Sequence, residues 1–267
     1  MRNTLKLYGR YLGVSARTQL QYRASFIMQV LGQLGITVIE FFSIWALFHR
    51  FQRLGEWTLP EVGVFYGAVG MAWALADAVG RSFDNFGQVV KAGDFDRILL
   101  RPRSTVFQLL AQGTQLRRFG RMLQAGTVLG WAWLELGIGA SPERMLLLAV
   151  AIAGGAALFL GLLVVQATIA FWTVESLEIM NVMTYGGVTT AQYPLSIYPD
   201  WLRRFFVFFV PLGVTLYFPI VKVLGKTDPL GSPEWLGWAG PLAGGLFLAA
   251  ALQVWRLGVR YYTSTGS

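Results

Sequence analysis

Long apolar runs separated by short charged segments dominate the sequence. A helix crosses about 30 Å of hydrocarbon with roughly 20 residues, because each residue adds about 1.5 Å of rise. Runs of about this length predict membrane spans over residues 24–48, 62–79, 122–139, 145–172 and 235–255. The run over 145–172 contains a block of small residues, which favours close contact with another helix. These are Gly154, Gly155, Ala156 and Ala157.

The pattern changes between residues 177 and 234. An apolar segment with scattered polar residues over 177–195 predicts one more span, the fifth in chain order, which makes six in all. The next apolar segment is interrupted by proline, which lacks the N–H group that a continuous helix needs. The prolines of this region are Pro194, Pro199, Pro211 and Pro219. We therefore expect a broken pair of half-helices over 196–222, a re-entrant segment that enters the outer leaflet and returns.

These elements predict an all-α membrane protein, with a six-helix transmembrane domain over residues 24–267 and both termini inside. The charge distribution favours this orientation. With the amino end inside, the inner segments hold 15 Lys and Arg residues and the outer segments hold 7. An excess of basic residues on the inner side is what sets the orientation of membrane proteins.

Composition excludes the common soluble classes. The chain is 55% apolar and only 13% charged, whereas soluble domains carry about 25% charged residues. The net charge of +8 could indicate binding to nucleic acid. The basic residues lie between apolar runs, however, as expected if they orient the chain in a membrane. We therefore expect membrane lipid, and no nucleic acid, as a partner.

The first 23 residues predict a separate amphipathic helix that lies in the inner interface. At 100° per residue, its basic residues fall within an arc of about 80°, where they can face anionic lipid head groups. These residues are Arg2, Lys6, Arg10 and Arg17. A solvated basic tail is the alternative, because Gly9 and Gly13 both weaken a helix.

The sequence shows no enzymatic site. It has no Cys and one His, which excludes thiolate chemistry and leaves too few ligands for a multi-histidine metal site. Gly225 and Lys226 resemble the end of a phosphate-binding loop, but Ile220 stands where that loop requires glycine. We therefore expect a chain that is not an enzyme and carries no metal or cofactor of its own.

The predicted inner loop, residues 81–105, carries apolar residues at helical spacing. A short amphipathic helix over 83–91, which Gly93 ends, is predicted by the helical spacing of Phe83, Phe86, Val89 and Val90. A second helical turn follows from Asp94. Exposed apolar side chains in a structured loop would offer a docking surface for a partner. The alternative is that this face lies on the lipid head groups.

The loop also resembles that of a known family. The run from Gly93 to Pro102, GDFDRILLRP, is similar to the inner-loop signature of type-2 ATP-binding-cassette permeases, the ABC-2 type, which have six spans. Phe95 stands where many members have leucine. The later Tyr-Pro and Phe-Pro pairs around the four prolines resemble the broken outer half-helices of that family. The resemblance covers essentially the whole chain.

The resemblance implies the permease subunit of an ATP-driven exporter in the plasma membrane of a prokaryote. It implies a second permease subunit, identical or homologous, and separate ATPase subunits that bind ATP and magnesium. The inner loop and the amino-terminal helix would contact the ATPase. The residues to which the resemblance gives a coupling role are Phe83, Phe86, Val89, Val90, Gly93, Asp94, Phe95, Asp96, Leu99 and Leu100.

Two acidic residues lie inside predicted spans. A charge at the bilayer centre costs about 2.5–3.5 kcal/mol on insertion scales, so each should face protein or water. Asp77 lies four residues before Arg81, a spacing that predicts an ion pair. Glu40, with Gln29 and Gln33 on the same helix, could line a translocation path for cationic or amphiphilic cargo. The alternative is a structural hydrogen-bonding role.

Two other functions remain open at this level. An energy-independent channel or secondary carrier would show charged pairs deep in several spans, or internal repeats, and neither is evident in the sequence. A membrane scaffold could use the same inner loop to recruit a cytoplasmic protein. The sequence does not indicate the chemical class of the cargo.

Overall fold

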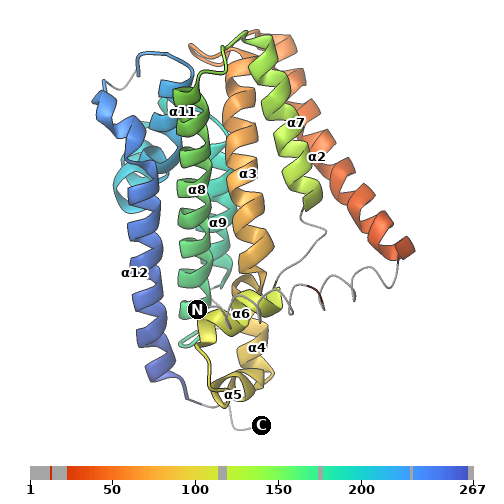
Figure 1. Ribbon diagram of the computed structural model, residues 1–267, viewed down its shortest axis with the longest axis vertical. Helices are drawn as coiled ribbons and strands as arrows, with labels where there is room; N and C mark the ends of the chain where they lie inside the picture. The colour runs from red at the N-terminus through yellow and green to blue at the C-terminus, as the bar shows by residue number, and fades with distance from the viewer. Residues whose placement is uncertain (1–12, 14–22, 114–118, 174–176, 229–230, 264–267) are drawn as a thin grey trace.

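The computed structural model describes residue 13 and residues 23–113, 119–173, 177–228 and 231–263. The described residues form a bundle of helices (Figure 1). Six helices of 15 or more residues run along its length within these ranges. They are α2 (Arg23–Phe51), α3 (Leu59–Asp84), α7 (Phe119–Glu135), α8 (Pro142–Ile169), α9 (Leu177–Ala191) and α12 (Gly240–Tyr261). The predicted amino-terminal helix, with Arg2, Lys6, Arg10 and Arg17, lies outside the described residues.

The long helices alternate in direction along the chain (Figure 1). Helices α2, α7 and α9 run upward in that view, and α3, α8 and α12 run downward. The first described helix therefore begins at the same end of the bundle where the last one finishes. We call this the lower end. It also carries three short helices, which are α4 (Phe86–Lys91), α5 (Asp94–Leu99) and α6 (Thr105–Gly113).

Helix boundaries follow local sequence signals. Helix α3 begins with a capping box, in which the amide of Thr58 donates to Glu61 Oε2 at 2.8 Å. Helix α8 begins at Pro142, directly after Ser141, whose hydroxyl accepts from the amide of Arg144 at 3.3 Å. The last predicted span starts later than expected, because residues 234–238 form a separate 3₁₀ turn, η5 (Glu234–Trp238).

Three helical stretches among the described residues are long enough and apolar enough to cross a membrane. They are Leu59–Lys91, which joins α3 and α4, Pro142–Ile169 and Gly240–Tyr261. Helices α7 and α9 have 17 and 15 residues, fewer than the roughly 20 that a bilayer needs. The described part of the chain thus contains three candidate spans, or four if the bent pair described next is one span.

The proline-rich region forms the predicted broken pair at the upper end. Its two arms, Asp200–Phe209 and Gly213–Val223, meet at 83°. The arms consist of α10 (Asp200–Arg204), η3 (Phe205–Phe209), η4 (Gly213–Tyr217) and α11 (Phe218–Val223). Pro211 lies in the bend, whereas Pro194 and Pro199 precede helical segments and Pro219 lies in the first turn of α11. The prediction of a helix break is confirmed, and three of the four prolines mark starts of segments.

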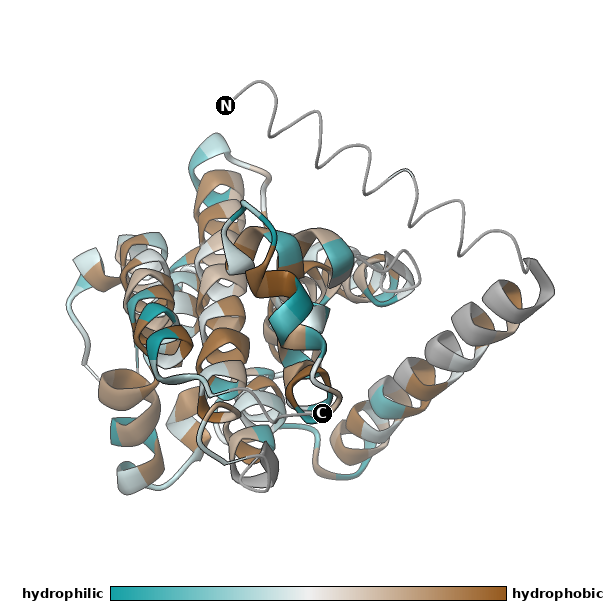
Figure 2. Cartoon of the chain, turned by 90° about the horizontal axis from the view of Figure 1, so that it is seen from below, coloured by the Kyte–Doolittle hydropathy of each residue, from teal (hydrophilic) through white to brown (hydrophobic). Residues whose placement is uncertain are grey.

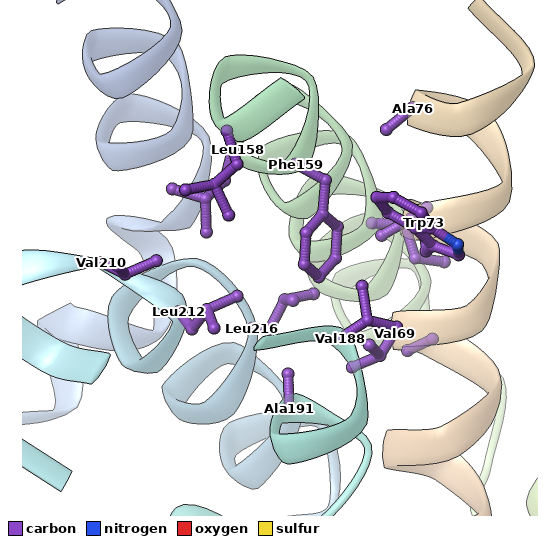
Figure 3. Close-up of a cluster of buried hydrophobic side chains, with 14 of the residues drawn as sticks. Val69, Trp73, Ala76, Leu158, Phe159, Val188, Ala191, Val210, Leu212 and Leu216 are labelled. Carbon is purple, nitrogen blue, oxygen red and sulfur yellow. The ribbon is translucent and has the colours of Figure 1, made fainter. Parts of the chain in front are cut away.

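Small residues bring the long helices into close contact. On α3, Gly67 and Gly70 approach Leu129 and Ala125 of α7 so closely that an added Cβ would lie within 3 Å of them. On α8, Gly154 lies against the backbone of Gly240 at the start of α12. The predicted role of Gly154 in close helix contact is therefore confirmed. Apolar side chains of α3, α8, α9 and the bent pair fill the core between them (Figure 3).

Helix α2 is the exception to this packing. It leans away from the bundle toward its lower end in Figure 1, and it stands apart from the other helices when the molecule is seen from below (Figure 2). Large apolar side chains of α2 are exposed along its length. They include Met28, Leu31, Ile39, Phe42 and Phe51. Such a helix needs lipid or another protein around it.

The loop that joins α2 to α3 is fixed to the segment that follows the bent pair. The ammonium group of Lys226 lies 2.8 Å from Glu61 Oε1 and 4.7 Å from the centre of the Trp57 ring. The indole N–H of Trp57 donates to Ser196 Oγ at 2.9 Å. These contacts tie together three segments that are far apart in the sequence, so the upper end is held as one unit.

Candidate functional site

The loop at the lower end folds into two short helices joined by a left-handed residue. Gly93 has a φ of +69° between α4 and α5, a backbone conformation that glycine adopts without steric cost. The predicted helix over 83–91 differs in one respect, since α3 continues through Phe83 to Asp84 before α4 begins at Phe86. Asp94 is the first residue of α5.

The apolar side chains of this loop are buried inside the chain. The rings of Phe86 and Phe95 lie 5.0 Å apart and edge to face. Both also contact Phe171, just beyond the end of α8, and Trp255 of α12, at centroid distances between 4.9 and 6.2 Å. We call these four rings, together with Phe83, the aromatic cluster. Trp255 Nε1 donates to Thr105 Oγ1 at 3.0 Å, which joins α6 to the cluster.

The expectation that the apolar helical face is exposed for docking is therefore wrong for most of its residues. The buried ones are Phe83, Phe86, Val90 and Phe95, and the half-buried ones are Val89, Gly93 and Asp96. The physical reason is that the lower ends of α8 and α12 cover this face, so it has no need of an outside partner.

A smaller surface remains open on α5 and on the residue that follows it. Leu100 is 86% exposed and Leu99 is 41% exposed. Asp94 and Arg97 lie beside them, 3.5 Å apart and both largely exposed. We call these four residues the lower-end face. An exposed leucine pair rimmed by charge is typical of a protein contact site.

The last described residues of the chain secure the loop from the other side. The ring of Tyr262 contacts Phe95 at 4.9 Å and Phe171 at 5.7 Å. Burial raises the pKa of the Tyr262 phenol, and the nearby Asp96 carboxylate raises this pKa further. The lower-end face is therefore carried on a rigid base made from α3, α8, α12 and the segment after it.

Above this base, polar side chains join α3, α8 and α9. Arg81 contacts Asp84 at 2.5 Å and Asp77 at 3.7 Å, so the predicted pairing of Asp77 with Arg81 is confirmed. Tyr185 donates to Asp84 at 3.0 Å, and Gln166 donates to Asp84 at 3.3 Å. Sequence analysis missed Gln166, although a glutamine in the middle of an apolar run is the signal that could have found it.

A cavity of about 480 Å³ opens between α2, α3, α7 and α9, and we call it the lateral cavity. Its polar lining residues are Glu40, Ser43, Tyr66, Trp73, Arg121, Gln124, Tyr185, Thr189, Gln192 and Tyr193. Its apolar lining residues are Ile44, Leu47 and Val188, with Gly70 between Tyr66 and Trp73. Since Gly70 lies near the middle of α3, the cavity lies at mid-depth of a candidate span.

The acidic residue Glu40 of the predicted path does line this cavity. The phenol of Tyr66 donates to Glu40 Oε2 at 3.4 Å, and Gln124 Nε2 donates to the Tyr66 oxygen at 3.4 Å. Gln29 and Gln33 belong to α2, but their side chains lie outside those that the structure describes. The structure adds Arg121 of α7, which sequence analysis assigned to the inner loop.

Within the described residues, no group of three or more His, Asp or Glu side chains is placed to hold a metal ion. The comparison with protein families gives a match over residues 34–266, to the family described as ABC-2 family transporter protein. The chain belongs to the ABC-2 transporter family. This ABC-2 transporter is accordingly a membrane protein with transmembrane helices. Searches of curated proteins and of solved structures gave no match.

Proposed function

We propose that this ABC-2 transporter is the permease subunit of an ATP-driven exporter in the plasma membrane of a prokaryote. In this proposal it pairs with a second permease subunit, identical or homologous, and forms half of the translocation path. Separate ATPase subunits bind ATP and magnesium and dock at the lower end. Family membership supports the transport role, and the rigidly based lower-end face is the observation that carries the docking assignment.

The proposal has six spans, with both termini on the inner side. The alternating direction of α2, α3, α7, α8, α9 and α12 supports an even number of crossings. Helices α7 and α9 are about 26 and 23 Å long at 1.5 Å per residue, so they cross only where the bilayer is thin or where flanking residues contribute. The bent pair then lies in the outer leaflet.

The coupling step follows from the packing of the loop. A force applied to Leu100 is passed through α5 to Phe95, whose ring is buried against Phe86, Phe171 and Trp255. Packed interiors move as units, since they are nearly incompressible. Closure of an ATPase dimer beneath α5 would therefore shift the lower ends of α3, α8 and α12 together.

Co-purification from the native membrane tests this proposal. The wild-type chain should retain an ATP-hydrolysing subunit. Leu100→Ser should weaken its retention about 30-fold, because truncating a central interface residue costs about 2 kcal/mol. Leu134→Ser is the matched control, since Leu134 is 82% exposed on α7 at the other end of the bundle, and it should retain the subunit.

Each outcome decides one part of the proposal. Repeated purification of the wild-type chain without any ATP-hydrolysing subunit would overturn the exporter assignment. Retention of that subunit by Leu100→Ser at the wild-type level would overturn the docking face alone. Cargo movement in reconstituted vesicles without ATP would instead favour a channel or secondary carrier.

A further inference from the structure

The lateral cavity is lined by one acidic residue, Glu40 near the middle of α2, and by one basic residue, Arg121 in the first turn of α7. Glu40 and Arg121 both line it, yet neither forms an ion pair with any of the described residues. The contact from Tyr66 to Glu40 is long, at 3.4 Å, and such a distance gives only weak stabilisation. A carboxylate in the middle of a span, such as Glu40, is usually retained for a function, and both charges can take a counter-charge from a ligand in the cavity.

A third group points to a bound molecule. Trp73 is only 1% exposed, and its indole N–H has no acceptor among the described residues. Its ring is held edge to face by Phe159 at 5.6 Å and by Tyr185 at 5.3 Å. Figure 3 shows the ring nitrogen on the side of Trp73 away from Phe159. A buried donor at the wall of a cavity is expected to have a partner there, because an unsatisfied one is costly.

The opposite charges of Glu40 and Arg121 disfavour a ligand that carries a single sign of charge. A purely cationic ligand beside Glu40 would meet the guanidinium of Arg121, and a purely anionic ligand beside Arg121 would meet the carboxylate of Glu40. Both repulsions are strong where water is scarce. A zwitterion satisfies both residues at once and leaves an anionic oxygen to accept from Trp73 Nε1.

The remaining walls suit an apolar chain. Ile44 and Leu47 line the cavity from α2, and the neighbouring Phe42 and Trp45 are exposed on the same helix. A ligand with a polar head inside the cavity could therefore lay an apolar tail along α2. This arrangement matches an amphiphile that enters from the bilayer.

We propose that the lateral cavity binds the zwitterionic head group of an amphiphile, with its ammonium group at Glu40 and its phosphate or carboxylate at Arg121. Trp73 Nε1 donates to the anionic group, and the tail packs against Ile44 and Leu47. The inference rests on the proposed function only in treating this ligand as cargo. Binding itself requires no ATPase, so the two proposals can fail separately.

Competition binding with the full chain in a maltoside detergent tests the proposal. The probe is a fluorescent lysophosphatidylcholine, and the competitors share one tail length: lysophosphatidylcholine, lysophosphatidylglycerol and an alkyltrimethylammonium. The zwitterion should compete at least tenfold better than the anion or the cation. Tail-free glycerophosphocholine, which has the same net charge as the lipid, forms a fourth arm. If it competes as well as the lipid, the natural ligand is a water-soluble zwitterion; if it competes weakly, the ligand is a lipid.

Charge-removing variants should change selectivity in opposite directions. Glu40→Gln should weaken binding of the zwitterion at least tenfold, since the carboxylate that attracts its trimethylammonium group is lost. It should also relieve the discrimination against lysophosphatidylglycerol, since the like charge that repels the anion is lost with it. Arg121→Gln should instead relieve the discrimination against the cation. Glu135→Gln and Arg256→Gln remove charges outside the cavity and should change neither.

A conservative variant keeps the test decisive if a charge-removing variant does not fold. Trp73→Phe retains an aromatic ring but removes the indole N–H together with one ring of the indole, and it should weaken binding of the zwitterion about fivefold to tenfold. Equal competition by all three lipids, or wild-type binding by Glu40→Gln, Arg121→Gln and Trp73→Phe, would overturn the proposal. Loss of the co-purifying ATPase has no bearing on any of these outcomes.

Discussion

The close contact between α8 and α12 at Gly244 leaves no room for the methyl group that an alanine would add there. A Cβ added at Gly244 of α12 would lie 2.8 Å from the carbonyl carbon of Gly154 and 3.0 Å from its Cα, with the carbonyl oxygen closer still. All three atoms belong to the backbone, so no side chain can turn aside to make room. The next residue, Gly245, has nothing within 4 Å of the same added atom.

These two neighbours separate packing from helix propensity. Replacing a glycine by alanine in a helix gains about 0.5–1 kcal/mol at either position. Overpacking a tight contact costs about 1–3 kcal/mol, and only Gly244→Ala bears this cost. The free energy of unfolding should therefore be about 1–3 kcal/mol lower for Gly244→Ala than for Gly245→Ala.

Thermal unfolding of the purified protein, followed by circular dichroism, measures this difference. For a chain of this size, 1 kcal/mol corresponds to about 2–4 °C in Tm, so the Tm values of the two variants should differ by about 2–12 °C. Gly245→Ala should unfold at or slightly above the wild-type temperature. Equal Tm values for the two variants would show that α8 and α12 do not meet at Gly244, and would refute the packing described above.

Three further predictions concern the two ends of the bundle. Gly93→Ala should lower the free energy of unfolding by about 1 kcal/mol, because the backbone at Gly93 has a φ of +69°. Gly93→Asn should lower this free energy less, since asparagine tolerates the left-handed conformation better; thermal unfolding of the two variants measures the difference. Lys226→Met should destabilise the chain by about 1–3 kcal/mol by leaving the buried Glu61 carboxylate without its ion pair, and adding Glu61→Gln should recover part of the loss in a double-mutant cycle. Trp255→Phe should cost more than the about 1 kcal/mol of its bond to Thr105, because it also removes buried ring volume from the aromatic cluster; Thr105→Val should cost about 1 kcal/mol in the wild-type chain and little more in the Trp255→Phe background.

Sequence patterns located the long helices well. Apolar runs predicted α2, α3, α7, α8, α9 and α12 to within about six residues at each end, because a helix that crosses the hydrocarbon needs about 20 mostly apolar residues, a length that stands out in the sequence. The proline pairs predicted the break that lies at Pro211. Which prolines begin a segment and which one bends the chain depends on how the arms pack, and spacing alone does not contain that information.

At the lower end, the sequence pattern predicted the helix and left open what covers its apolar face. The spacing of Phe83, Phe86 and Val90 predicted an amphipathic helix, and α4 with the end of α3 is one. What covers its apolar face is decided by Phe171 and Trp255, which come much later in the chain. Periodicity identifies a face that must be buried and leaves open whether the same chain or a partner buries it.

The lateral cavity was predicted only in part. Glu40 attracted attention because a carboxylate in an apolar run is costly. Arg121 belonged to a stretch rich in arginine and gave no separate signal, and Trp73 looked like an ordinary core residue in the apolar run over 62–79. The three side chains come together only through the packing of α2, α3 and α7.

The central claim is that the lower end, with Leu100, faces the compartment that holds the ATPase. The chain has no cysteine, so Leu100→Cys and Ala140→Cys each introduce a unique label at opposite ends of the bundle. A maleimide that cannot cross membranes should label Leu100→Cys only in inside-out vesicles from which the bound ATPase has been removed, and Ala140→Cys only in right-side-out vesicles. Labelling of Leu100→Cys in intact, right-side-out vesicles would contradict the account.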